Sequence, residues 1–245
     1  MSYVRTRGMV VREVKVGEYD KILTVVTEDL GKISVSARGV RRGGNRYSAG
    51  TQVFSYCDWV LYKGKNTYIL NSCDIIDSFY EIRQDMTLLA HAAQMLQLVH
   101  DTTFENHPAK DQLTVFIYAL KALLNKRTPS LVFRVFALKT VQIIGFEPFV
   151  SGCCLCGTKE INDIRFSFEH CGFVCEQCNT GLENVIPVKT GAAKAMIYVL
   201  CADPGKAFGF ELSPDVLENF SEIVDRYIDD RLGKKYSKMN FLQEI

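Results

Sequence analysis

The sequence predicts an α+β protein with two domains, a small N-terminal β-barrel and a helical domain that carries a metal-binding hairpin. Three observations support this fold class. Residues 1–80 are rich in β-branched and aromatic residues and are interrupted by short turn segments. From residue 81 onward, apolar residues recur with helical spacing. Finally, six of the nine cysteines lie between positions 153 and 178.

The N-terminal domain, residues 1–80, contains five candidate strands separated by turns such as Asp29-Leu30-Gly31 and Gly43-Gly44. Five short strands favour a small closed barrel, because closure leaves few strand edges exposed. An SH3-like barrel or a small sandwich is compatible with the same pattern. The expected strands are Val4 to Val14, Ile22 to Thr27, Lys32 to Ala37, Val53 to Leu61 and Tyr68 to Phe79.

The second domain, residues 81–245, is predicted to be helical, with a zinc-binding module inserted at about residues 150–185. Its first helix shows the apolar stripe Leu88, Ala92, Met95 and Val99. Its last helix is expected to begin at Ser213-Pro214, because serine can cap a helix and proline suits the first turn. That helix should end near Leu232. Further helices fit Lys110 to Leu124, Leu131 to Ile144, and Gly191 to Leu200.

The composition narrows the class of protein. With 47% hydrophobic residues and a net charge of +1, the chain can bury a core, but its overall charge indicates no particular partner. The N-terminus lacks the pattern of a secretory signal, and no apolar run approaches the roughly 18 residues that span a membrane. We therefore expect a cytoplasmic protein without a membrane contact. Phosphate-binding glycine motifs and spaced catalytic histidines are absent from the sequence, so we expect no enzymatic activity.

Four cysteines form two Cys-x2-Cys pairs, Cys153 with Cys156 and Cys175 with Cys178, separated by eighteen residues. Two such pairs match a tetrahedral zinc site in which each short loop supplies two thiolates. A catalytic zinc needs an open coordination position, and four thiolates close the site. The spacing therefore predicts one structural zinc ion.

The residues around the two pairs suit a hairpin between two metal-binding turns. Gly157 and Asn179 follow the second cysteine of each pair, and both tolerate the left-handed conformation that a tight turn can demand. Ile164, Phe166 and Phe168 alternate between the pairs. Such alternation indicates strands.

Other interpretations of the cysteines stay open at this point. Cys154, Cys171 or His170 could replace one of the four ligands. The cysteines could also be buried free thiols, or one pair could be a redox centre. A redox centre predicts one active pair near a βαβ unit, whereas two pairs flank a hairpin here.

The barrel carries a basic segment between Lys32 and Tyr47, which contains no acidic residue. Its glycines, Gly39, Gly43 and Gly44, suggest a mobile loop. Arginine-rich loops suit phosphate contacts, because each neutralised phosphate releases condensed counterions. The candidate DNA-binding residues are Lys32, Arg38, Arg41, Arg42 and Arg46. A simple solvated turn is the alternative.

Aromatic residues near this loop could stack on unpaired bases, although each could equally belong to the barrel core. They are Tyr47, Phe54, Tyr56, Trp59 and Tyr62. A second basic run follows the acidic last helix and consists of Arg231, Lys234, Lys235 and Lys238. It either extends a DNA surface or balances the helix dipole and the carboxylates before it.

Several segments, in order along the chain, resemble the bacterial RecO family of recombination mediators. They include Gly8-Met9-Val10-Val11, the stretch from Gly17 to Leu23, the stretch from Thr27 to Lys32, and Ala37-Arg38-Gly39-Val40-Arg41. The Leu155-Cys156-Gly157 turn, the Cys175 pair and the segment from Arg231 to Tyr236 also resemble the zinc-bearing members. Cys154 and Cys171 depart from the family pattern.

The resemblance implies an oligonucleotide-binding (OB) barrel, a helical C-terminal domain and a zinc module. It also implies binding of single- and double-stranded DNA, annealing of complementary strands, and work with RecR and single-strand-binding protein to load RecA. Such a protein would be associated with the nucleoid. A zinc-dependent enzyme and a pure protein adaptor are the competing hypotheses.

Overall fold

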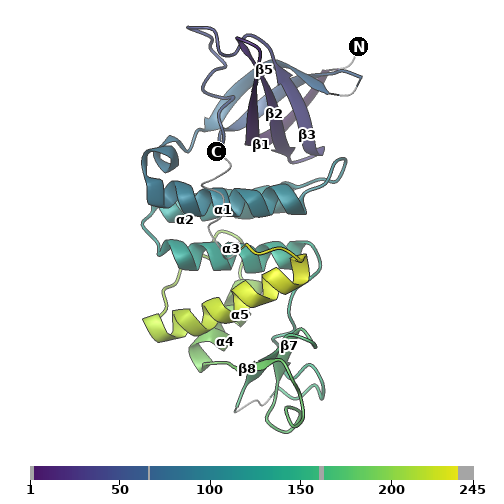
Figure 1. Cartoon of the computed structure of the whole chain (residues 1–245), viewed down its shortest axis with the longest axis vertical. Helices are drawn as coiled ribbons and strands as arrows, with labels where there is room; N and C mark the ends of the chain where they lie inside the picture. The colour runs from purple at the N-terminus through teal and green to yellow at the C-terminus, as the bar shows by residue number, and fades with distance from the viewer. Residues whose placement is uncertain (1–2, 66, 160–162, 237–245) are drawn as a thin grey trace. The chain divides into compact units, whose positions relative to one another are not determined.

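The structure is a computed structural model that describes residues 3–65, 67–159 and 163–236 (Figure 1). The chain forms two compact units, Met1–Leu120 and Lys121–Ile245. The first unit therefore holds the barrel together with the helices that follow it. The sequence predicted a domain boundary at residue 80, where the barrel ends. The boundary between the two compact units lies 40 residues later, after Leu120.

The N-terminal strands form a closed five-stranded barrel with the order β1-β2-β3-β5-β4. All neighbouring strands are antiparallel except β3 and β5, which are parallel. Closure confirms the predicted small barrel over the open sandwich, and this arrangement is that of an OB-like fold. The strands are β1 (Tyr3–Val16), β2 (Asp20–Thr27), β3 (Gly31–Ala37), β4 (Tyr56–Lys63) and β5 (Tyr68–Asp77).

The barrel core follows from alternation along the strands. In β2 and β3, Leu23, Val25, Ile33 and Val35 point inward, and their neighbours in β3 are half-buried. Trp59 is fully buried in the same core and donates from its indole Nε1 to the Gly8 carbonyl, 2.9 Å away. A buried indole N–H needs a hydrogen-bond acceptor, and the Gly8 carbonyl supplies one.

The β2–β3 turn is joined to the segment after the first helix. This helix, α1 (Met86–Thr102), begins at Asp85, whose carboxylate accepts bonds from two backbone N–H groups of the first turn. After α1 the chain returns to the barrel, where the Lys32 N–H donates to the Phe104 carbonyl at 3.1 Å. Gly31 has a φ of +68°, and a Cβ there would lie 2.2 Å from the Phe104 oxygen. Only glycine fits this close approach.

The second unit packs helices against a small three-stranded sheet of order β7-β6-β8. Within it, the Arg134 guanidinium on α3 and the Asp225 carboxylate on α5 form an ion pair of 2.7 Å. The elements not yet given are η1 (Tyr80–Gln84), α2 (Lys110–Leu124), α3 (Pro129–Ile143), β6 (Arg165–Ser167), β7 (Gly172–Val174), β8 (Val185–Pro187), α4 (Thr190–Cys201) and α5 (Pro214–Leu232).

The predicted start of α5 is correct, but the predicted cap is wrong in detail. Ser213 occupies the N-cap position and Pro214 the first turn, yet the serine side chain makes no capping bond. Its hydroxyl donates to the Asp215 carboxylate at 2.7 Å instead. The aspartate carboxylate is a strong acceptor for the serine O–H, and an acidic residue in the first turn complements the helix dipole.

Candidate functional site

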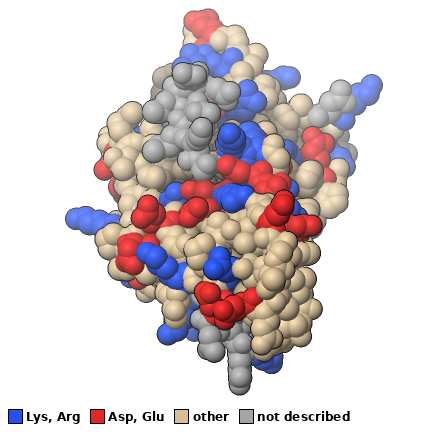
Figure 2. Space-filling model, turned by 60° about the horizontal axis from the view of Figure 1, so that its bottom comes forward, with Lys and Arg blue, Asp and Glu red and all other residues tan. Residues whose placement is uncertain are grey.

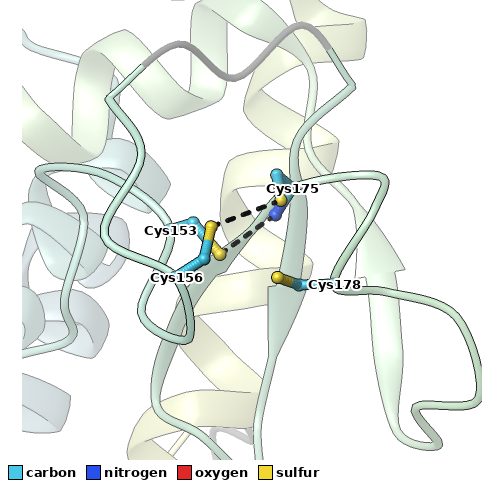
Figure 3. Close-up of side chains that lie close together, drawn as sticks. All are labelled: Cys153, Cys156, Cys175 and Cys178. Carbon is cyan, nitrogen blue, oxygen red and sulfur yellow. Dashed lines mark hydrogen bonds between the residues drawn. The ribbon is translucent and has the colours of Figure 1, made fainter.

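Four thiols from two separate turns meet in the second unit. The Sγ atoms of Cys153, Cys156, Cys175 and Cys178 all lie within 4.8 Å of one another. Figure 3 shows the two pairs facing each other, and the Cys156 and Cys175 sulfurs are 3.8 Å apart. Cys153 and Cys175 are buried, and Cys156 is exposed. Such a group could hold a metal ion.

The two turns repeat one hydrogen-bonding pattern. The Gly157 N–H donates to the Cys153 carbonyl at 2.9 Å, and the Asn179 N–H donates to the Cys175 carbonyl at 3.0 Å. Gly157 takes the expected left-handed conformation, with a φ of +76°. Asn179 does not, and Gly181, with a φ of +81°, is the left-handed residue of the second turn. The sequence predicted that both positions tolerate this conformation, and the second turn does not use it at Asn179.

The thiols are set up to ionise unequally in the absence of a cation. Burial opposes ionisation of Cys153, but backbone N–H groups outweigh it and lower the pKa of this thiol to about 6. Cys178 shows the opposite shift, because hydrogen bonding to Cys175 and Cys156 raises its pKa to about 12. Closely spaced thiolates repel one another, so a divalent cation is needed for all four to ionise.

The remaining candidate ligands lie outside this cluster. The Cys154 N–H donates to the Phe173 carbonyl at 2.8 Å. The Cys171 thiol accepts a bond from the Arg231 guanidinium at 3.1 Å and contacts the Phe168 carbonyl. Neither residue belongs to the four-thiol group, and His170 does not belong to it either.

Aromatic contacts attach the cysteine hairpin to α5. The Phe166 ring on β6 packs edge-on against Tyr227, with ring centres 5.5 Å apart. The guanidinium of Arg226 lies 4.2 Å from the ring centre of Phe168. A metal bound at the four thiols would therefore stabilise the hairpin that buries these rings.

The basic segment of the barrel presents most of its cations to solvent. Arg38, Arg41, Arg42 and Arg46 are exposed. Lys32 differs, because it is half-buried and its Nζ donates to the His100 carbonyl at 2.7 Å. Its ammonium thus already has a partner near the C-terminal end of α1, where the helix dipole favours a cation.

The aromatic candidates on β4 and before it belong mainly to the interior. Trp59, Phe54 and Tyr56 are buried, and Tyr56 donates to the Glu28 carboxylate at 2.6 Å. The aromatic pattern of the sequence did not single out Tyr19, which lies in the β1–β2 turn with 39% of its surface exposed. Strand alternation carries no signal for such a turn residue.

The described residues of the second basic run include two that lie beside acidic groups. Arg231 binds the Asp230 carboxylate, and Lys235 lines a surface hollow together with Glu222, Asp225 and Asp229. Basic and acidic side chains lie interspersed on the face of the molecule shown in Figure 2. Lys238 lies outside the described residues. This arrangement favours charge balance over a separate DNA surface.

Family models match nearly the whole chain. Residues 1–79 match the model described as "Recombination protein O N terminal", and residues 83–239 match "Recombination protein O C terminal". The chain belongs to the RecO family. The resemblance noted in the sequence is thereby confirmed, and RecO is a family of DNA repair and recombination proteins.

Curated RecO relatives are similar over their full length. "DNA repair protein RecO" of Acetivibrio thermocellus is 39% identical, with 100% of this chain and 98% of the relative covered. The protein of the same name from Alkaliphilus metalliredigens is 32% identical over 92% of each chain. That of Caldicellulosiruptor bescii is 29% identical over 100% of each.

The boundary between the two family models falls near residue 80, where the barrel ends. The pattern of strands in the sequence predicted the same boundary. Among the residues that the structure describes, no helix has both the length and the apolar character needed to cross a bilayer.

Proposed function

We propose that the chain is a DNA-binding recombination mediator that acts without covalent chemistry. It binds single- and double-stranded DNA, anneals complementary strands and, with RecR, loads RecA onto DNA covered by single-strand-binding protein. Its place of action is the cytoplasm, at the nucleoid. The main support is full-length membership in RecO together with the exposed arginines on the barrel.

The arginine segment offers a physical route to annealing. Arg38, Arg41 and Arg42 lie on one short loop without an acidic residue, so their charges add at one place. Neutralising phosphates releases counterions and lowers the repulsion between two strands. Lowered repulsion lets complementary bases meet more often, and pairing itself then supplies the specificity. We propose Lys32 and Arg46 as further members of this DNA surface.

We propose zinc as the metal of the four-thiol group. A tetrahedral site with Zn–S bonds of about 2.3 Å separates the sulfurs by about 3.8 Å. The Cys156 and Cys175 sulfurs are 3.8 Å apart, which matches this geometry. Because four thiolates leave no open position, the ion would be structural and would supply folding energy. This supports a protein without enzymatic activity.

The experiment is a strand-annealing assay with complementary oligonucleotides, without nucleotide, repeated over a range of salt concentrations. We expect faster annealing than the spontaneous rate and a binding constant that falls steeply with salt. Replacing Arg38, Arg41 and Arg42 together with alanine should flatten this salt dependence. A matched triple variant at Lys110, Lys121 and Lys194, exposed residues that do not belong to the loop, removes the same charge and should not flatten it.

The outcomes separate the hypotheses. No acceleration over the spontaneous rate would contradict the mediator role. An unchanged salt slope in the arginine variant would place the DNA path elsewhere. Absence of DNA affinity at low salt would favour the adaptor hypothesis.

A further inference from the structure

Tyr19 is an exposed aromatic side chain beside the arginine loop. It lies in the turn between β1 and β2, and 39% of its surface is accessible. By contrast, Trp59 and Phe54, which the aromatic pattern of the sequence had put forward, are 0% and 2% exposed. Tyr19 is therefore available for stacking, and these two residues are not.

A cation from the basic loop covers this ring. The guanidinium carbon of Arg42 lies 5.1 Å from the centre of the Tyr19 ring, within the range of a cation–π contact. Both groups are flat, and both stack on nucleobases in protein–nucleic acid complexes. Together they place an aromatic ring and a cation side by side at the surface of the barrel.

Several bonds hold the loop against the turn. The Gly39 N–H donates to the Asp20 carboxylate at 2.7 Å, and the Arg41 N–H donates to the Tyr19 carbonyl at 3.0 Å. The Arg41 side chain bonds the Gly17 carbonyl at 3.2 Å. The predicted mobile loop is thus tied by hydrogen bonds in the structure. These bonds bring Tyr19 and Arg42 together across 23 positions of sequence.

The location agrees with the general behaviour of this barrel type. In OB folds, the loop between the first two strands contributes to oligonucleotide binding. Glu18 hydrogen-bonds the Tyr19 hydroxyl and raises its pKa, so this carboxylate acts at the polar end of the ring. The ring faces do not depend on the hydroxyl.

We propose that Tyr19 and Arg42 together bind an unpaired base and give the protein a preference for single-stranded over double-stranded DNA. This inference rests on the proposed DNA binding and deepens it. In a duplex each base is already stacked and paired, so it is not available to the ring. Phosphates are present in both forms, so Arg38 and Arg41 contribute to both.

The test compares binding to oligo(dT) and to a DNA hairpin duplex at one salt concentration for the full chain and three variants. Tyr19→Ala should weaken single-strand binding about 5- to 100-fold and leave duplex binding within about twofold, since one stacked base is lost. Tyr19→Phe should bind as the parent does. Tyr118→Ala is the matched control, because Tyr118 on α2 is similarly exposed at 41%.

A second measurement identifies the contact directly. Photocrosslinking with an oligonucleotide that contains 5-iodouracil should label the peptide with Tyr19. Equal loss of single-strand and duplex binding in Tyr19→Ala, or no loss, would overturn the inference, as would crosslinks only at other peptides. Failure of the parent protein to bind either DNA at low salt would instead contradict the proposed function itself.

Discussion

The Tyr227 hydroxyl on α5 donates a hydrogen bond to the Phe146 carbonyl, 2.8 Å away, in the segment that leads from α3 to the first cysteine pair. Burial raises the pKa of Tyr227, so this hydroxyl keeps its proton and acts as the donor at neutral pH. The same ring packs against Phe166 of the cysteine hairpin. One side chain thus ties to α5 both the segment before the first cysteine pair and the hairpin between the two pairs.

Removing the Tyr227 hydroxyl should therefore destabilise the second unit. Tyr227→Phe keeps the ring but leaves the Phe146 carbonyl without its donor, at a cost of about 1 kcal/mol in the free energy of unfolding. Urea denaturation measures this change. Tyr118→Phe, at an exposed position, should cost far less. Equal effects of the two changes would show that the bond to Phe146 contributes nothing.

The four proposed ligands should behave alike when changed one at a time. Serine at Cys153, Cys156, Cys175 or Cys178 should release most of the metal and lower the melting temperature by at least about 5 °C, because metal binding and folding are coupled. Metal content and thermal unfolding should be measured on the same samples.

Cys154→Ser and Cys171→Ser provide the matched controls for the ligand set, since neither thiol belongs to the four-thiol group. Both variants should keep the metal. Loss of metal from either would revise the ligand set. A ligand variant that keeps its metal and fold but loses a catalytic rate would favour an enzyme.

Alanine substitutions at Gly31 and Gly17 distinguish the cost of a steric clash from the cost of a positive φ. Both have positive φ values, +68° and +57°, so alanine should cost about 1–2 kcal/mol at each from strain alone. Only Gly31 also has a backbone oxygen 2.2 Å from the added Cβ. Gly31→Ala should thus be the more destabilising by more than about 1 kcal/mol, as measured by denaturant unfolding. Similar losses would mean that the Phe104 segment moves aside at little cost.

Lys32 and Arg41 should differ in how they affect DNA binding. The half-buried Lys32 ammonium bonds the His100 carbonyl at 2.7 Å, whereas Arg41 is exposed on the loop and makes a longer bond of 3.2 Å to the Gly17 carbonyl. We expect Lys32→Ala to lower the free energy of unfolding by about 1 kcal/mol and to weaken DNA binding less than Arg41→Ala does. Salt-dependent binding and urea denaturation on both variants check this. A larger binding defect at Lys32 would show that its bond to His100 gives way to phosphate.

Local patterns predicted most of the secondary structure of this chain, although not η1 or β8. The five strands and the helices from Met86 onward lie within a few residues of the predicted ranges. Alternation and helical spacing reflect which face of each element is buried, and that information lies within the element itself. The spacing of the cysteine pairs likewise predicted the four-thiol group, because each pair lies on one short turn with its own hydrogen bond.

Side-chain partners between distant elements were a different matter. Strand alternation predicted that Trp59 and Tyr56 lie on opposite faces of the strand, but it could not decide which face lies inside the barrel. In the structure both side chains are buried. Tyr56 reaches burial outside the barrel core through its bond to Glu28, which is 28 residues away. Such a contact depends on how elements pack and leaves no periodic trace in the sequence.

The sequence by itself determined that a β-barrel is followed by a helical domain, and it identified the barrel strands and the four cysteines. Each of these depends on residues close together in the chain. Only the tertiary structure decided which basic and aromatic side chains of the barrel stay exposed to solvent. It brought the His100 carbonyl to Lys32, 68 residues away, and Arg42 onto Tyr19. The His100 carbonyl restrains the Lys32 ammonium, whereas Arg42 and Tyr19 stay exposed at the surface, and both outcomes follow from contacts between residues far apart in the chain.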